Sequence, residues 1–261
     1  MKIYDTHAHL DHVENLETAL KDADQVGVVG IICVSMDVAS SQKNLEIKRK
    51  FKSPKIYLAM GMHPSEAKLS DLDNLKKLII ENKNELTAVG EIGLDFSYKW
   101  VRKDQVKRNE QRQVFAELLK MAVELDLPAI IHSRGMEQEC LDTAKKLGVK
   151  KGIFHWYSGP VDVLKKIMDE GYFVSTSPSV AYSPPSREAM THAAIEQTLI
   201  ETDSPVNFKN PTTEESFISE PKDVFRTLKA YASLKNISEE KAAEQLNRNT
   251  ISFFNLEKGL S

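Results

Sequence analysis

At residues 89–95 the chain reads VGEIGLD, which places the carboxylate of Glu91 between two glycines at the end of the apolar run LTAV, residues 86–89. Glycine lets the backbone turn sharply and approach a ligand closely, so this pattern predicts that Glu91 is presented at the tip of a β-strand rather than packed. The same heptapeptide also fits an ordinary strand end with a solvated glutamate. The first interpretation is favoured by five other places where an apolar run ends in His or Asp.

Apolar runs of this kind occur eight times along the chain, and a segment with helical periodicity follows each of them. The expected strands are residues 3–5, 28–35, 56–60, 86–91, 128–131, 151–154, 172–175 and 198–200. The expected helices are residues 16–24, 38–51, 70–82 with Ser70 as N-cap, a segment after residue 108 that contains Phe115, Leu118, Leu119 and Ala122, and then residues 137–147, 161–170, 188–195, 221–234 and 238–254. Long loops are expected at residues 96–108, 177–186 and 206–219.

This alternation of strands and helices predicts the fold. Strands that alternate with helices indicate a parallel sheet, and eight repeats in about 250 residues fit a closed barrel. We therefore expect an α/β fold, a single (β/α)8 TIM barrel with an additional C-terminal helix. No linker or shift in composition indicates a domain boundary, so one domain is expected over residues 1–261. The alternative is an open doubly wound sheet, but its phosphate-binding fingerprint G-x-G-x-x-G does not follow the first strand.

The composition argues against several classes of function. With 35 Lys and Arg against 38 Asp and Glu, the net charge of -3 gives no global attraction to nucleic acid or to a membrane surface. A polyanionic substrate would have to be held by a local patch or by a metal. The two cysteines, Cys33 and Cys140, do not indicate a disulfide framework, which favours a reducing compartment. Because neither a signal peptide nor an apolar run of about 18 residues is present, we expect a cytoplasmic protein without a membrane partner.

In a (β/α)8 barrel the C-terminal ends of all strands lie at the same end, where active sites of this architecture are found. The polar residues that end the apolar runs are therefore expected to lie close together. The residues at these ends are His7, His9, His63, Glu91, His132, His155 and Asp203. His7 and His9 are two residues apart, so in an extended segment both side chains face the same side and can bind one ion. A single histidine is more often a core or surface residue, but the joint placement of this set predicts a metal site. Pro64 fixes the backbone after His63, which is expected to face substrate rather than metal.

Six motifs occur in a fixed order along the chain. They are DTHAHLD at residues 5–11, GMHP at 61–64, GEIGLD at 90–95, HSR at 132–134, FHWYSG at 154–159 and ETDSP at 201–205. This series resembles that of the TatD family, which comprises metal-dependent hydrolases of the amidohydrolase superfamily and includes several deoxyribonucleases. The resemblance covers nearly the whole chain.

The resemblance implies a centre that binds two divalent metal ions. It assigns His7, His9 and Asp203 to one ion, His132 and His155 to the second, and Glu91 to a bridge between them. It makes His63 the substrate-facing histidine. Imidazole and carboxylate ligands suit zinc or manganese, whereas the deoxyribonucleases of the family are often described as magnesium-dependent, so zinc, manganese and magnesium all stay open.

The expected reaction is hydrolysis of a phosphodiester bond by a metal-bound hydroxide, because a bound ion lowers the pKa of water toward ~7. The predicted catalytic residues are Glu91, Asp203 and His63. Asp203 would orient the water and pass its proton to the leaving oxygen, while His63 and Arg134 would bind the phosphate. Arg134 fits a structural ion pair equally well.

Two loops bear on the substrate. Residues 98–108 carry five positive charges, one acid and two aromatic residues, which fits the edge of a groove for single-stranded nucleic acid and also fits a solvated surface segment. The loop after Asp203 has Lys209 where many family members have an arginine and an asparagine-containing turn. This difference weakens the case for phosphate binding on that side.

Three hypotheses follow for the function. The first is a deoxyribonuclease, exonucleolytic on single-stranded DNA or acting on another phosphate-containing substrate. The second is an amidohydrolase-type enzyme that cleaves a C–N or ester bond of a small molecule or of an aminoacyl-tRNA. The third is a catalytically silent barrel that uses its metal structurally.

Overall fold

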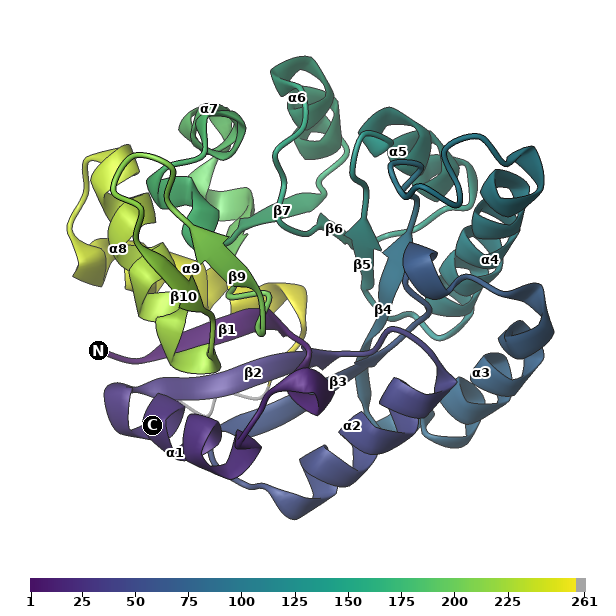
Figure 1. Ribbon diagram of the computed structural model, residues 1–261, viewed down its shortest axis with the longest axis horizontal. Helices are drawn as coiled ribbons and strands as arrows, with labels where there is room; N and C mark the ends of the chain where they lie inside the picture. Colours follow the sequence, from purple (N-terminus) through teal and green to yellow (C-terminus); the bar gives the residue numbers. More distant parts are fainter. Residues whose placement is uncertain (257–261) are drawn as a thin grey trace.

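The computed structural model describes residues 1–256, which form an eight-stranded parallel sheet with sequential strand order (Figure 1). The strands are β1 (Ile3–Ala8), β2 (Val28–Val34), β3 (Lys55–Met60), β4 (Leu86–Gly93), β5 (Ala129–His132), β6 (Gly152–Phe154), β7 (Phe173–Thr176) and β8 (Thr198–Ile200). Ala8 at the end of β1 forms a parallel bridge with Ser204, just after β8. The two edge strands therefore meet, and the predicted (β/α)8 TIM barrel is confirmed.

Helices surround the barrel, one after each strand, and a further helix follows at the C-terminal side. They are α1 (Leu16–Val26), α2 (Val38–Lys50), α3 (Leu69–Glu81), α4 (Gln105–Glu124), α5 (Glu137–Lys146), α6 (Val161–Asp169), α7 (Pro184–His192), α8 (Val224–Lys235) and α9 (Glu239–Phe253). None of the helices in residues 1–256 is long and apolar enough to cross a membrane. Since residues 257–261 lie outside the described part, the single domain over residues 1–261 stays a prediction.

The additional helix α9 closes the end of the barrel at which the strands begin. The side chain of Asn247 donates to the carbonyl oxygen of Lys2, just before β1, at 2.8 Å. Phe253 and Phe254 pack in one buried cluster with Tyr4 and other apolar side chains of the barrel strands. Apolar groups thus pack between α9 and the barrel, and the pocket lined by His9, His132 and Asp203 lies at the opposite end.

The apolar spacing of α4 is confirmed, since Phe115, Leu118, Leu119 and Ala122 are all buried. Asp104 is the N-cap of this helix. Its side chain accepts hydrogen bonds from the backbone N–H groups of Val106 at 2.9 Å and Lys107 at 3.1 Å. A carboxylate in this position satisfies N–H groups that have no partner within the helix.

Three expectations about local structure are wrong. Helix α3 begins at Leu69 after the N-cap Lys68, so Ser70 lies inside the helix and is not the cap. Helix α7 begins already at Pro184, because proline suits the first turn of a helix, where its missing N–H leaves no bond unmade. The expected loop 206–219 contains the antiparallel strands β9 (Asn207–Lys209) and β10 (Ser216–Ile218).

Candidate metal centre

Glu91 lies inside β4 and is only 1% exposed, so the expectation that it is presented at a strand tip is wrong. The two glycines next to it serve the packing of β4 against β5. A Cβ atom on Gly90 would lie 2.6 Å from the Cβ atom of Ile130, and one on Gly93 would lie 1.9 Å from the carbonyl oxygen of His132. Both contacts are too short for real atoms, so only glycine lets β4 approach β5 this closely.

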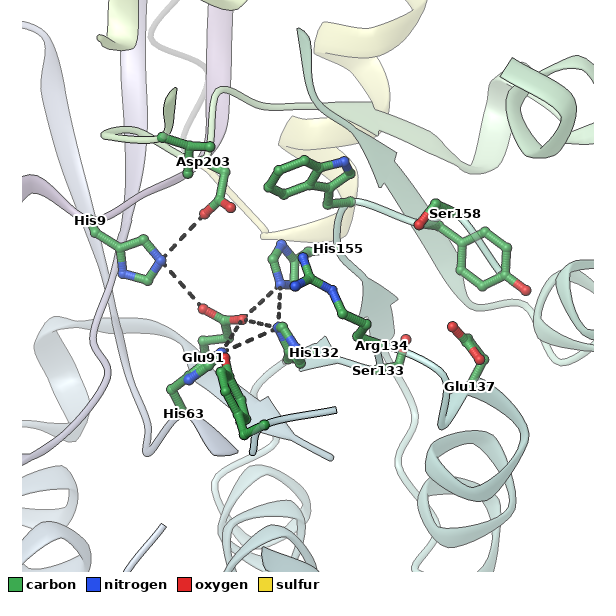
Figure 2. Close-up of a pocket in the computed structure, with 14 residues that line it drawn as sticks. His9, His63, Glu91, His132, Ser133, Arg134, Glu137, His155, Ser158 and Asp203 are labelled. Atoms are coloured by element: carbon green, nitrogen blue, oxygen red, sulfur yellow. Dashed lines mark hydrogen bonds and ion pairs between the residues drawn. The ribbon is translucent and has the colours of Figure 1, made fainter. Parts of the chain in front are cut away.

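The two carboxylate oxygens of Glu91 face two different groups of histidines (Figure 2). Oε1 lies 2.7 Å from Nε2 of His155 and 2.9 Å from Nδ1 of His132. Oε2 lies 3.2 Å from Nε2 of His7 and 3.4 Å from Nε2 of His9. Burial raises the pKa of Glu91, but the facing imidazoles, His155 first among them, lower it more, so this pKa lies well below its ordinary value.

Asp203 completes the group that contains His7 and His9. Its Oδ1 lies 3.3 Å from Nε2 of His9 and 3.5 Å from Nε2 of His7. The backbone holds it there, because the N–H of Asp203 donates to the carbonyl oxygen of His7 at 2.9 Å. The joining of β1 to the end of β8 therefore brings the first and last of the predicted ligands together.

Several polar side-chain atoms in this cluster are buried without a hydrogen-bond partner in the described structure. They are Nδ1 and Nε2 of His7, Nδ1 of His9 and Oδ1 of Asp203. Buried polar atoms are nearly always satisfied, so a set of unsatisfied ones on imidazole and carboxylate groups fits cation binding. Donor atoms of His7, His9 and Asp203 lie within 4.8 Å of one another, and so do donor atoms of His63, Glu91 and His132.

Three further buried carboxylates support the cluster from outside. Asp95 accepts at Oδ2 from Nε2 of His132 at 3.2 Å, and Glu201 faces Nδ1 of His155 at 3.3 Å. Asp5 accepts from the backbone N–H of Thr202, next to Asp203, at 2.9 Å. Such outer partners fix the orientation and tautomer of metal-binding groups. The prediction assigned these carboxylates no role, although each of them stands in one of the six motifs.

His63 lies within the cluster and not apart from it. Its Nε2 is 3.3 Å from Nδ1 of His132 and 3.6 Å from Oε1 of Glu91, while its Nδ1 accepts from the N–H of Ser65 at 3.1 Å. Burial lowers the pKa of His63 to about 3, although the Glu91 carboxylate acts in the opposite direction. The imidazole is therefore neutral at physiological pH.

Arg134 is exposed and follows β5 at the rim of a pocket of about 280 Å³ that lies over the cluster. Its side chain runs from the end of β5 toward the histidines (Figure 2). It forms no ion pair with any residue in 1–256, so the alternative of a structural ion pair is not supported. Lys209 in β9 is exposed and does not line this pocket.

The hairpin formed by β9 and β10 supports one wall of the pocket. Phe208 packs against Trp156, which lines the pocket after β6, with ring centroids 5.3 Å apart. The indole N–H of Trp156 donates to Ser179 at 2.9 Å. The backbone of Trp156 is left-handed, with φ of 42°, a conformation that bulky residues rarely adopt.

Comparison with known proteins places this arrangement in a family. The family described as TatD related DNase matches residues 4–255. The chain belongs to the TatD family. The relationship predicted from the six motifs is thus confirmed, and the protein is a metal-dependent hydrolase of this family with donor clusters that suit metal ions.

Relatives of this TatD family member cover almost the same length. The chain is 30% identical to an uncharacterized metal-dependent hydrolase of Methanocaldococcus jannaschii, over 97% of each chain. It is 27% identical to a human protein named deoxyribonuclease TATDN3, over 97% of this chain and 94% of that protein. The crystal structure of YjjV, a TatD homologue from Escherichia coli, superposes with a TM-score of 0.87 at 24% identity over 98% of each chain.

Proposed function

We propose that this TatD family protein is a deoxyribonuclease that hydrolyses phosphodiester bonds at a centre of two divalent metal ions. The observation that carries the proposal is the position of Glu91, whose two oxygens each face a separate pair of histidines. In this arrangement His7, His9 and Asp203 would hold one ion and His132 and His155 the second, and Glu91 would be shared by both. Two ions held by a shared carboxylate suit phosphoryl chemistry, in which charge develops on both the attacking and the leaving oxygen.

When bound, divalent ions lower the pKa of water and neutralise the charge on a phosphate. The donor set contains four imidazoles, which suits zinc or manganese better than magnesium. Zinc, manganese and magnesium are therefore the ions to test, in that order.

The residues of this chain have distinct roles in the proposed reaction. Asp203 orients the attacking water and takes its proton at a carboxylate oxygen, and then returns the proton to the leaving oxygen. The neutral imidazole of His63 forms a hydrogen bond to a phosphate oxygen from Nε2. The guanidinium of Arg134, which has no carboxylate partner in the described structure, binds the phosphate from the rim.

We further propose single-stranded DNA as the substrate and removal of nucleotides from an end as the mode of action. A pocket of about 280 Å³ suits one nucleotide better than a duplex. The human relative named deoxyribonuclease supports the same substrate class. The predicted cytoplasmic location stays a prediction.

The proposal is tested with end-labelled oligonucleotides. Protein purified without chelator is loaded with zinc, manganese or magnesium and incubated with single-stranded and duplex DNA of the same sequence. We expect stepwise release of mononucleotides from the single strand, and its loss in Glu91→Gln and Asp203→Asn. Circular dichroism of both variants controls for folding. Metal-loaded wild-type protein that releases no nucleotide with any of the three ions would falsify the proposal.

One observation favours the second candidate, hydrolysis of an amide or ester bond in a small molecule. The pocket contains the carboxylate of Glu137 together with Arg134, the one arginine or lysine that lines it. An acid in the pocket disfavours a polyanion and suits a neutral or cationic group. The two candidates are separated by assaying a panel of amides and esters, DNA and aminoacyl-tRNA in parallel. Hydrolysis of an amide, an ester or aminoacyl-tRNA without cleavage of DNA supports the second candidate.

A further inference from the structure

Two aromatic side chains are stacked on the connection between β4 and α4. The ring centroids of Tyr98 and Trp100 lie 4.8 Å apart, and their planes form an angle of 20°. Trp100 is 57% exposed and is the one exposed aromatic residue in the described range 1–256. A large ring that is covered on one face and open to water elsewhere is a surface that gains free energy when a second flat group covers it.

The stack is continuous with the candidate metal centre. Tyr98 lines the pocket together with Glu91 and His63. Its ring meets the ring of His63 edge-on, with centroids 6.3 Å apart and an interplanar angle of 78°. A series of ring contacts therefore leads from His63, through Tyr98, to the exposed ring of Trp100.

The connection that carries the stack is held in place by its own contacts. The backbone N–H groups of Val101 and Arg102 both donate to the carbonyl oxygen of Tyr98, at 2.9 and 2.8 Å. The side chain of Val101 is buried and anchors the turn. The two rings are thus arranged before any ligand arrives, which lowers the entropy lost on binding.

Three positively charged residues lie within three positions of Trp100 in the sequence. Lys99, Arg102 and Lys103 are exposed, and none of them forms an ion pair with any residue up to 256. Free cations next to an exposed aromatic ring are the combination with which proteins bind single-stranded nucleic acid, since the cations attract phosphates and the ring stacks on a base.

We propose that Trp100, supported by Tyr98, is a stacking site for the base of the nucleotide next to the phosphate held in the pocket. This inference rests on the proposed nuclease function. In a duplex both faces of an internal base are covered by its neighbours, so the site favours an unpaired base. Trp100 is therefore a specificity-determining residue that favours single-stranded over duplex DNA.

Fluorescence tests the stacking without cleavage. The chain has two tryptophans, so the variant Trp156→Phe leaves Trp100 as the single one. In the absence of divalent ions, we expect an oligothymidylate to quench its fluorescence, and an abasic oligonucleotide of equal length to quench it far less. The affinity of the double variant Trp156→Phe, Trp100→Ala for labelled oligothymidylate is measured by fluorescence anisotropy. Trp100→Ala should weaken binding about fivefold to a hundredfold, while Trp100→Phe keeps most of the affinity.

A matched control is Val106→Ala, which removes an exposed apolar side chain from the start of α4 without touching the stack. This variant should bind oligothymidylate like its parent. Equal affinity of the parent and Trp100→Ala, or equal quenching by the thymidylate and abasic strands, overturns the stacking site.

The two proposals fail in different ways. If the strand binds and quenches Trp100 but the metal-loaded wild-type protein cuts no DNA, the nuclease proposal is wrong and the stacking site stands. If DNA is cut and Trp100→Ala retains both the KM and the preference for single strands, the stacking site is wrong and the nuclease proposal stands. If the protein binds no oligonucleotide, the stacking site is wrong, and the nuclease proposal is decided by the cleavage assay with metal-loaded wild-type protein.

Discussion

At the scale of single residues, the candidate metal ligands were predicted because each of them lies at the end of an apolar run. In a (β/α)8 barrel the C-terminal ends of the strands all lie at one end. The structure brings the six residues together there: His7, His9, Glu91, His132, His155 and Asp203. The supporting carboxylates could not be assigned in the same way. Glu201 faces a histidine 46 residues away, and this pairing depends on the register of neighbouring strands, which the sequence does not specify.

We expect Glu201→Gln to weaken metal binding about 10- to 100-fold while the barrel stays folded, because the amide no longer provides a charged partner for Nδ1 of His155. Titration of the metal-free protein with zinc or manganese by calorimetry measures this affinity. Glu196→Gln, which changes an exposed glutamate outside the cluster, is the control. Unchanged affinity in Glu201→Gln would show that the carboxylate has no positioning role.

At the scale of elements, the apolar strands were predicted to within a few residues, since burial on both faces leaves a continuous apolar run. The hairpin of β9 and β10 was missed because it is short and packs through Phe208 against Trp156, a residue from a distant part of the chain. The role of the glycines in β4 was also missed. A glycine that approaches a ligand and one that approaches a neighbouring strand have the same sequence pattern.

The close approach of β4 to β5 makes a prediction about Gly90. We expect Gly90→Ala to lower the free energy of unfolding by about 1–3 kcal/mol, because the new Cβ atom would lie 2.6 Å from Cβ of Ile130 and must displace it. Urea denaturation measures the change. In the control Gly152→Ala, the added atom meets only the ring of Tyr172, at 3.4 Å, so its effect should be smaller. Equal stability of the two variants would contradict this account of the packing.

At the scale of the whole molecule, the barrel encloses a polar cluster at one end and apolar side chains from α9 at the other. At the polar end, buried nitrogen and oxygen atoms of His7, His9 and Asp203 have no hydrogen-bond partner in the described residues. A ligand that binds only the folded state stabilises it by mass action. The cluster should therefore link the stability of the entire chain to the concentration of metal.

We expect zinc or manganese at 100 times its dissociation constant to stabilise the fold by about 2.7 kcal/mol, and so to raise the melting temperature by several degrees above that in chelator. Differential scanning calorimetry of the metal-free protein, with and without added ion, provides the measurement. Glu91→Gln should abolish most of the shift. A melting temperature that is the same in chelator and in metal would argue against a bound ion.

The bond from Asp203 to His7 also has a consequence for biosynthesis. The neighbouring contact between Thr6 and Ile200 spans 194 residues, so nearly the whole polypeptide must leave the ribosome before the two edges of the sheet can meet. A nascent chain that carries His7, His9, His132 and His155 but not yet β8 lacks the carboxylate of Asp203, which completes the group with His7 and His9. We therefore expect translation products truncated before Asp203 to be inactive, and the site to form only after synthesis is almost finished.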